Sequence, residues 1–193
     1  EEAHVTFGTT VSLFNDKYIV SLFLGILFIV GIDVGLNTTI PKLLMDRTGM
    51  PLSEAGLGTS LYFAARTIGS FVGALLLAKL SASRFLKYSM FVAIVAFVLL
   101  LAVPATWSMF VMIVIVGLAC ANVFSIIFSF ALQHKPERAN EISALMIMGV
   151  SGGALITPLM GIVADGFGQV AGLSILLLCI LYICIISFRI DKK

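Results

Sequence analysis

Charged residues are scarce in this sequence, and that scarcity excludes most classes of protein. Asp, Glu, Lys and Arg make up only 11% of the 193 residues, against about a quarter in an ordinary soluble domain. The 12 basic and 10 acidic side chains leave a formal charge of +2 and form no basic face, which excludes nucleic-acid binding. Hydrophobic residues make up 60% of the chain, enough for roughly six membrane spans of about 20 residues each. The composition therefore predicts a multi-pass protein of the lipid bilayer.

The sequence also lacks the local patterns of enzymes, metal centres and cofactor sites. It contains no H-E-x-x-H, G-x-S-x-G or Walker motif, and no filter-like loop of a channel. The cysteines Cys120, Cys179 and Cys184 lie inside apolar runs without a C-x-x-C pair, so we expect neither disulfides nor zinc. His4 and His134 lie at the ends of apolar runs and are interpreted as solvated loop residues. We therefore predict no enzymatic activity, no metal and no cofactor.

Six apolar segments divide the chain, separated by breaks that carry Gly, Pro or charge. The expected spans cover residues 18–44, 53–80, 85–103, 106–132, 140–164 and 169–188. We expect the first span to end near Pro41. Residues 1–16 are predicted to be the end of an inter-domain linker, 17–188 the six-helix bundle and 189–193 a tail. The chain opens on Glu1 with no basic leader, so we expect a piece of a longer polypeptide.

Lysine and arginine are unevenly distributed between the two ends of these spans. Nine lie on the side of the chain termini: Lys17, Lys79, Arg84, Lys87, Lys135, Arg138, Arg189, Lys192 and Lys193. Only Lys42 and Arg47 lie on the other side, and Arg66 is inside the second span. Because cytoplasmic loops are enriched in Lys and Arg, this distribution predicts that both termini are cytoplasmic. The expected location is the inner (plasma) membrane.

A weak internal repeat relates the two halves of the chain. The segment 30–32 in the first span returns as 116–118 in the fourth, and residues 73–79 of the second span are echoed by 161–165 in the fifth. Two three-helix units in inverted topology are typical of secondary transporters. The predicted fold class is therefore an all-α membrane protein of six transmembrane helices in two inverted three-helix repeats.

Two ionisable residues, Asp33 and Arg66, lie well inside predicted spans. A charge at that depth costs about 2.5–3.5 kcal/mol on insertion scales, so each requires a reason. The functional interpretation is that both face a water-filled cavity, where they bind a polar substrate or carry a proton. The alternative is a buried ion pair that holds two helices together. Both interpretations can hold, since a substrate or a proton can compete for the pair.

Polar side chains accompany this pair at helical spacing. Asn37 follows Asp33 by four residues, and Tyr62 and Ser70 flank Arg66 by four residues on either side. Stripes of amides, hydroxyls and an aromatic ring suit an uncharged polyhydroxyl ligand. Hydrogen bonds between helices are the alternative use of such side chains.

The fourth span carries a similar stripe, in which Asn122, Ser125 and Ser129 have the spacing i, i+3 and i+7. Of these, Asn122 is the candidate ligand, with interhelical hydrogen bonding again as the alternative. The predicted substrate-binding residues are Asn37, Tyr62, Arg66 and Asn122. Asp33 with Arg66 is predicted to serve proton coupling or to form an ion pair.

Glycine and proline gather in the fifth span. Pro158 removes a backbone N–H and frees a carbonyl, so a kink is expected there. Gly152 and Gly153 precede it and make the helix deformable. We therefore predict a hinge for alternating access at these three residues. Close helix packing through G-x-x-x-G pairs such as Gly149 and Gly153 is the alternative.

The fifth span also resembles a known family. Its spacing of polar and small residues is similar to the eleventh transmembrane helix of the fucose–galactose–glucose:proton symporters, bacterial sugar permeases of the major facilitator superfamily. The residues that carry this resemblance are Ser143, Met148, Gly152, Gly153, Thr157, Pro158, Met160, Gly161 and Asp165. Arg66 and Gly69 with the basic loop that follows resemble the eighth helix, and Phe124, Phe128 and Ser129 resemble the end of the tenth. Residues 28–34 are similar to a further family pattern.

The resemblance covers about residues 17–188 and implies the C-terminal half of a twelve-helix transporter. It implies an N-terminal six-helix bundle as partner, a substrate site between the bundles near mid-membrane, and alternating access by rocking. The implied activity is proton-coupled symport of a monosaccharide. The main proton-coupling carboxylates would then lie in the other half, and Asp33, engaged by Arg66, would be a secondary candidate. Two alternatives stay open: an efflux antiporter for amphipathic compounds, with a cavity of Phe and Met, and a six-helix scaffold that translocates nothing.

Overall fold

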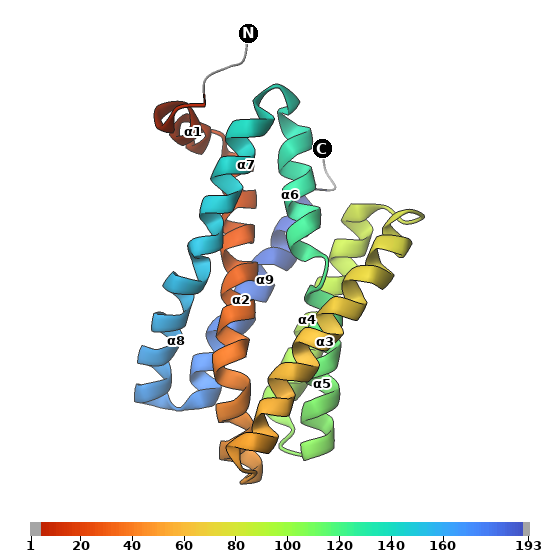
Figure 1. Ribbon diagram of the computed structural model, residues 1–193, viewed down its shortest axis with the longest axis vertical. Coiled ribbons are helices and arrows are strands. Elements are labelled where there is room, and N and C mark those ends of the chain that lie inside the picture. The colour runs from red at the N-terminus through yellow and green to blue at the C-terminus, as the bar shows by residue number, and fades with distance from the viewer. Residues whose placement is uncertain (1–4, 191–193) are drawn as a thin grey trace.

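The computed structural model describes residues 5–190, in which all regular structure is helical (Figure 1). The α-helices are α1 (Phe7–Ser12), α2 (Lys17–Thr48), α3 (Leu52–Leu77), α4 (Ala82–Ala102), α5 (Thr106–Cys120), α6 (Val123–His134), α7 (Ala139–Met148), α8 (Gly152–Phe167) and α9 (Gln169–Ile190). Three short 3₁₀ turns accompany them: η1 (Leu13–Asn15), η2 (Pro136–Arg138) and η3 (Gly149–Ser151). His4 and the rest of residues 1–4 of the predicted linker, and residues 191–193 of the predicted tail, lie outside the described residues.

Within residues 5–190, six segments are long and apolar enough to cross a bilayer. Helices α2, α3, α4 and α9 each form one span, the fourth span combines α5 and α6, and the fifth combines η2, α7, η3 and α8. Figure 1 shows the two ends of the chain at the same end of the bundle, together with the α3–α4 and α6–α7 connections. The α2–α3, α4–α5 and α8–α9 connections lie at the opposite end, because successive spans cross the bundle in alternating directions.

The two three-span units make reciprocal contacts. The first unit is α2, α3 and α4, and the second is α5/α6, α7/α8 and α9. Helix α8 packs against α2 as α3 packs against α5, and α9 packs against α2 as α4 packs against α5. The first spans of the two units meet through α2 and α6, and the last through α4 and α9. Two repeats in inverted topology produce this exchange, so the predicted all-α fold of six spans is confirmed.

Helix α2 lies at the centre of the bundle and contacts α3, α6, α8 and α9. Asp16 caps its first turn, because the carboxylate Oδ1 accepts a hydrogen bond from the N–H of Tyr18 at 2.9 Å. Side chains less than 2% exposed follow its whole length: Ile19, Leu22, Ile26, Ile29, Ile32, Leu36, Ile40, Leu43 and Leu44. The helix that carries Asp33 is thus held on most sides by apolar packing.

The prediction that the first span ends near Pro41 is wrong. Helix α2 continues through Pro41 to Thr48. Proline removes one helical hydrogen bond and crowds the preceding turn, but Leu43 and Leu44 beyond it are only 1% and 0% exposed, and their burial offsets that cost. The helix ends at Gly49, whose φ of 69° is left-handed and whose N–H bonds the Met45 carbonyl at 3.0 Å.

Two spans are interrupted within their length. In the fourth, Asn122 has φ −107° and ψ 1° and separates α5 from α6. In the fifth, the 3₁₀ turn η3 separates α7 from α8. Pro158 itself lies inside α8. The irregular backbone of the fifth span therefore directly precedes Gly152 and Gly153 and lies about two turns before Pro158.

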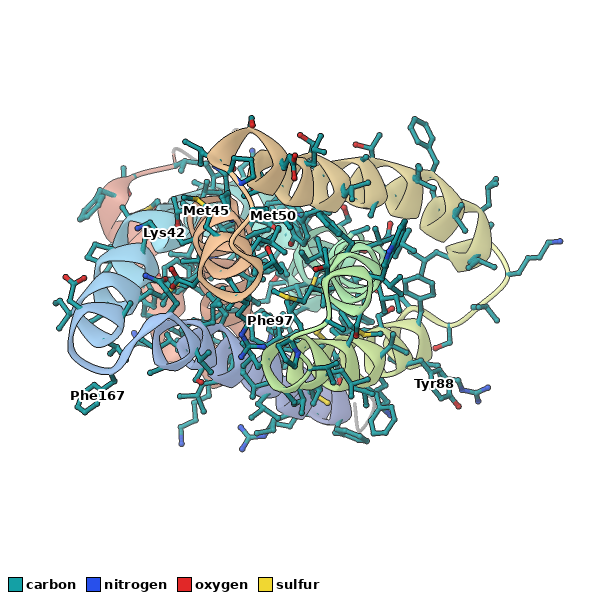
Figure 2. The ribbon with its side chains drawn as sticks, turned by 90° about the horizontal axis from the view of Figure 1, so that it is seen from below. Lys42, Met45, Met50, Tyr88, Phe97 and Phe167 are labelled. Carbon is teal, nitrogen blue, oxygen red and sulfur yellow. The ribbon has the colours of Figure 1, made fainter. Side chains whose placement is uncertain are left out.

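Large apolar side chains cover the outside of the bundle as well as its core. Phe97 is fully buried, whereas Phe71, Leu75 and Phe167 are 73%, 74% and 83% exposed. In the view along the long axis, Phe167 and Tyr88 lie at the periphery (Figure 2). Such an exterior is suited to lipid or to a partner bundle and not to water.

Candidate substrate site

A charged cluster lies halfway along α2 and α3. Asp33 is 16 residues from the start of α2 and 15 from its end. The Tyr62 hydroxyl donates a hydrogen bond to its Oδ1 at 2.6 Å, and the Arg66 guanidinium pairs with its Oδ2. Tyr62 and Arg66 are one turn apart on α3, so one face of α3 occupies both carboxylate oxygens.

The cluster is open on one side. Tyr62 is fully buried, but the side chains of Arg66 and Asp33 keep 19% and 20% of their surface exposed. Charged surface at the middle of a span is not compatible with lipid and requires a water-filled cavity or protein. The two residues form the ion pair of the alternative interpretation, and the access of a substrate or a proton to that pair stays a prediction.

Asn37 lies on the same side of α2, one turn beyond Asp33, and is exposed. Among the described residues, its side-chain amide has no hydrogen-bond partner. Ser70 differs, because its hydroxyl donates to the Arg66 carbonyl at 2.9 Å. The structure therefore brings Asp33, Tyr62 and Arg66 together and leaves Asn37 available beside them.

Asn122 is placed between helices. It is 7% exposed, and its Nδ2 donates to the Gly69 carbonyl of α3 at 2.9 Å. A Cβ on Gly73 would overlap this amide. The geometry is that of the interhelical alternative, and the role of Asn122 as a substrate ligand stays a prediction. Because the backbone breaks at this residue, Asn122 does not share the exposed face of Ser125 and Ser129.

An aromatic hollow on α6 was not singled out as a site in the sequence. Phe124 and Phe128 stack with ring centroids 5.9 Å apart and an interplanar angle of 19°. With Ser125, Ser129 and Leu132 they line an open hollow of about 300 Å³. Ring faces beside hydroxyls suit a sugar, which has both apolar faces and hydroxyl groups. Two phenylalanines one helical turn apart, each followed by a serine, are the sequence pattern that could have predicted this hollow.

A second open hollow, of about 530 Å³, lies between α2 and α8. It is lined by Val34, Val150, Ser151, Gly153, Ala154, Thr157 and Pro158. The Thr157 hydroxyl is buried and has no hydrogen-bond partner among the described residues. An unpartnered buried hydroxyl is costly, so Thr157 is a polar group of α8 that the packing of this bundle leaves unsatisfied.

The predicted hinge glycines lie where α8 crosses α2. A Cβ on Gly152 would overlap the Leu27 carbonyl, and one on Gly153 would lie 2.7 Å from a methyl carbon of Val34. Close packing therefore accounts for both glycines. The hinge at Gly152, Gly153 and Pro158 stays a prediction, located beside the irregular backbone of η3.

The interpretation of His134 as a solvated loop residue is wrong. Its Nε2 lies 2.9 Å from Asp16 Oδ2, and its ring centroid lies 4.4 Å from that of Tyr18. Lys135 Nζ is also 2.9 Å from Asp16 Oδ2. Burial alone would raise the pKa of Asp16, but hydrogen bonds from Lys135, His134 and the Tyr18 N–H hold this pKa well below its ordinary value of 3.8.

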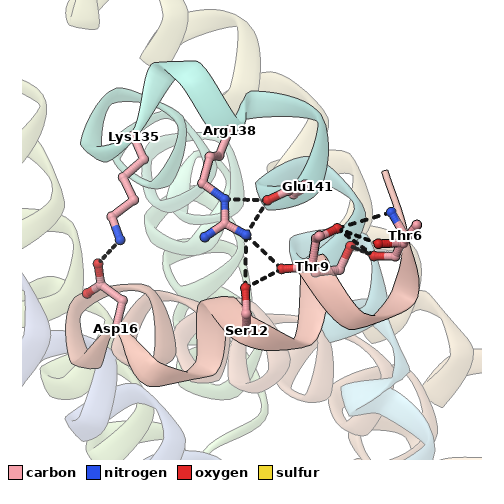
Figure 3. Close-up of polar contacts among 8 residues, drawn as sticks. Thr6, Thr9, Ser12, Asp16, Lys135, Arg138 and Glu141 are labelled. Carbon is pink, nitrogen blue, oxygen red and sulfur yellow. Dashed lines mark hydrogen bonds and ion pairs between the residues drawn. The ribbon is translucent and has the colours of Figure 1, made fainter. Parts of the chain in front are cut away.

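A second polar network fastens α1 to the start of α7 (Figure 3). The Arg138 guanidinium bonds the Glu141 carboxylate, the Thr9 carbonyl at 2.7 Å and the Ser12 hydroxyl at 3.0 Å. Glu141 is only 8% exposed. Ser12 and Thr9 are 126 and 129 residues from Arg138 along the chain, so no local sequence pattern predicts these contacts. Part of the predicted linker is thus docked on the bundle.

No three His, Cys, Asp or Glu side chains within residues 5–190 are grouped so that they could hold a metal ion. Six spans in two inverted units, with a charged cluster at mid-depth, define one bundle of a secondary transporter. Residues 22–193 match the family model of the Major Facilitator Superfamily, and the chain belongs to this superfamily of transporters.

Curated relatives of the chain are bacterial sugar transporters. It is 25% identical over 190 residues to a putative glucose/galactose transporter of Helicobacter pylori strain J99, covering 96% of this chain and 46% of the relative. It is also 25% identical over 177 residues to a glucose/galactose transporter of Brucella abortus, covering 89% and 42%. The chain therefore spans less than half the length of these relatives.

The chain also covers about half of the solved structures that it matches. The Escherichia coli fucose:proton symporter FucP superposes with a TM-score of 0.85 at 19% identity, over 97% of this chain and 46% of FucP. A bacterial homologue of the human lysosomal transporter Spinster gives 0.65 at 18% identity, over 94% and 50%. At these identities the likeness concerns the fold, which is that of half a major facilitator transporter.

Proposed function

We propose that this chain is the C-terminal bundle of a transporter that carries a monosaccharide together with protons by alternating access. The observation that carries the proposal is the cluster of Asp33, Tyr62 and Arg66 at the middle of α2 and α3, in which the two charged side chains stay partly exposed. The names of the relatives, glucose/galactose transporter and fucose:proton symporter, support the substrate class and the coupling ion.

Side chains of α2 and α6 can serve a sugar. The Asn37 amide offers both a donor and an acceptor, as two neighbouring sugar hydroxyls require. The stacked rings of Phe124 and Phe128 offer apolar faces for the sugar ring. The substrate would lie between α2, α3 and α6 on this side and the partner bundle on the other.

The two contacts of Asp33 support a role for this carboxylate in proton coupling. Protonation neutralises the carboxylate and weakens its pair with Arg66, because a charge-assisted hydrogen bond is about twice as strong as a neutral one. The released guanidinium can then donate to a sugar hydroxyl. Proton and sugar would in this way stabilise the same arrangement of Arg66. The main coupling carboxylates are assigned to the partner bundle on the family resemblance.

The same proposal includes the partner bundle, the orientation in the membrane, the linker and the hinge. The polar face of α2 and α3 requires a partner, for which we propose the N-terminal six-helix bundle of the same transporter. The excess of Lys and Arg at the end that holds the termini supports a cytoplasmic location for that end. The membrane that we propose is the inner membrane. Residues 1–16 would join the two bundles, and the hinge would lie at Gly152, Gly153 and Pro158.

Counterflow in proteoliposomes that contain the intact transporter tests the proposal. Labelled glucose, galactose and fucose are offered separately, with a lipophilic cation as comparison. We expect exchange of one sugar, at least tenfold slower in Asn37→Ala and Arg66→Gln. Exchange of the cation and of no sugar would instead support an efflux antiporter, and exchange of neither solute by correctly folded protein would support a scaffold.

The Asp33→Asn variant tests the coupling step. It should keep sugar exchange but lose accumulation driven by a pH gradient, because the amide cannot take up a proton. Asp46→Asn is the matched control, since Asp46 is exposed near the end of α2. Normal pH-driven accumulation in Asp33→Asn would remove Asp33 from the coupling mechanism.

A further inference from the structure

A groove of about 580 Å³ opens where the α3–α4 connection and α4 meet α5. Its lining residues are Lys79, Leu80, Ser81, Arg84, Phe85, Tyr88, Ser89, Val92, Ile115, Leu118 and Ala119. None of them belongs to the Asp33 cluster or to the hollows on α6 and α8. The α3–α4 connection lies at the end of the bundle that holds both termini (Figure 1), so the groove begins at one boundary of the membrane.

The lining residues of α4 change in polarity with depth. Arg84, Tyr88 and Val92 are four residues apart and therefore lie on one face of the helix. At a rise of about 1.5 Å per residue, Tyr88 lies about 6 Å and Val92 about 12 Å deeper than Arg84. A cation, an amphipathic ring and an aliphatic side chain thus follow one another from the membrane boundary inward. A phospholipid has the same order of phosphate, glycerol and acyl chain.

The groove offers apolar surface for acyl chains. Tyr88 is 72% exposed and Val92 45%, and Figure 2 shows Tyr88 at the outer edge of the bundle. Leu118 of α5 and Leu80 of the connection add side chains that are 40% and 51% exposed. The buried Ala119 contributes a small side chain to the floor, where a larger one would reduce the hollow.

The charge of the groove selects the headgroup. Lys79 and Arg84 are both exposed, and neither side chain has a hydrogen-bond or ion-pair partner in the part of the chain that is described. The eleven lining residues include no carboxylate. Ser81, the N-cap of α4, makes no side-chain cap bond, so the positive end of the helix dipole adds to the two cations. A zwitterionic headgroup would gain less here than an anionic one.

We propose that this groove binds an anionic phospholipid, with its phosphate between Lys79 and Arg84 and an acyl chain along Tyr88, Val92 and Leu118. Basic pockets between membrane-spanning helices at a membrane boundary are suited to such lipids. The inference is independent of the transported solute, because it concerns the outer surface of the bundle and not the polar face of α2 and α3.

Native mass spectrometry of the protein, purified in its native assembly and delipidated, tests the site by titration with phosphatidylglycerol or phosphatidylcholine. We expect a tightest site that prefers phosphatidylglycerol. Lys79→Gln and Arg84→Gln should each weaken that site by about fivefold, and the double variant by about 25-fold. Arg84→Lys keeps the charge and should keep the lipid. Both residues are exposed, so these variants leave the core unchanged.

Two further variants separate the groove from general surface charge. Ser89→Phe fills the groove while keeping both cations and should remove the tightest-bound lipid. Lys42→Gln removes an exposed cation at the opposite end of the bundle and should change the affinity less than twofold. Equal binding of the two lipids, an equal loss in Lys42→Gln, or full binding in Ser89→Phe would overturn the proposal. Displacement of the lipid by millimolar inorganic phosphate would overturn it as well, since the acyl chains would then contribute nothing.

Discussion

Asp33 and Arg66 illustrate how single charged residues are accommodated at the middle of a membrane span. The carboxylate has a partner on each oxygen, one from the fully buried Tyr62 and one from Arg66. The pair remains about one-fifth exposed, so its attraction is neither fully screened nor fully desolvated. Removal of one partner therefore costs more than removal of both.

The first prediction concerns this pair. Arg66→Gln should destabilise the protein by up to about 3 kcal/mol, because it leaves the Asp33 carboxylate without its counter-ion. The double variant Asp33→Asn/Arg66→Gln should recover most of that loss while transport stays absent. Thermal unfolding in detergent measures stability and counterflow measures transport. Full transport by the double variant would mean that the pair serves packing alone.

The second prediction concerns the pH dependence of Asp16. Because its pKa in the folded protein lies well below 3.8, its stabilising contribution is present above about pH 4 and is lost only as the pH falls through that lowered value. Asp16→Ala should lose about 1 kcal/mol more than Asp16→Asn, which keeps the helix cap. Unfolding is measured from pH 7 to pH 3 in a His134→Gln background, in which Asp16 keeps Lys135 and the Tyr18 N–H as partners. A loss of the Asp16 contribution already at pH 6 would contradict the lowered pKa.

At the scale of elements, the bundle depends on close crossings and on two interrupted spans. Asn122 ends α5 and turns its amide toward α3, where Gly69 supplies the carbonyl and Gly73 the space. Gly152 likewise permits close contact between α8 and α2, where a Cβ would overlap the Leu27 carbonyl. In both cases an irregular backbone lies next to a close contact between a glycine and a neighbouring part of the bundle.

The third prediction tests the α3–α5 crossing. Gly73→Ala should destabilise the protein by about 1–3 kcal/mol, because the added methyl overlaps the Asn122 amide. Asn122→Ala in the same chain should remove most of that penalty. Gly161→Ala is the matched control, since nothing lies within 4 Å of a Cβ at this exposed helical position. It should stabilise the protein by about 0.5–1 kcal/mol. Equal effects of the two substitutions would argue against the crossing.

At the scale of the whole molecule, this chain has the architecture of half a transporter. Its relatives and the FucP structure are more than twice its length. The polar cluster on α2 and α3 and the aromatic hollow on α6 are partly open, whereas other surfaces, such as that of Phe71 and Leu75, are apolar. A partner bundle over the polar side and lipid over the apolar surfaces would satisfy both.

The fourth prediction concerns the orientation of the molecule. After replacement of the three native cysteines, a single cysteine at Glu137 should be protected from a membrane-impermeant thiol reagent in intact cells. A single cysteine at Asp46 should react. Both positions are exposed but lie at opposite ends of the bundle. The reverse pattern would show that the termini face outward, against the distribution of Lys and Arg.

The sequence by itself determined the class of protein, the number of spans and the two charged residues worth explaining. These properties follow from local composition: a run of about 20 apolar residues must cross the bilayer, and a charge inside it is costly wherever the helix packs. The pairing of Asp33 with Arg66 was also among the expected alternatives, because a mid-span carboxylate has few other partners.

Only the tertiary structure decided where Asn122 and His134 point and where α2 ends. His134 contacts Asp16, which is 118 residues away in the sequence, and Asn122 contacts Gly69, which is 53 residues away. Neither contact can therefore be predicted from the neighbouring sequence. Pro41 favours a helix end locally, but the burial of Leu43 and Leu44 against other helices carries α2 on to Gly49. Composition determines which segments enter the membrane, whereas the packing energy between distant segments determines which polar groups they share.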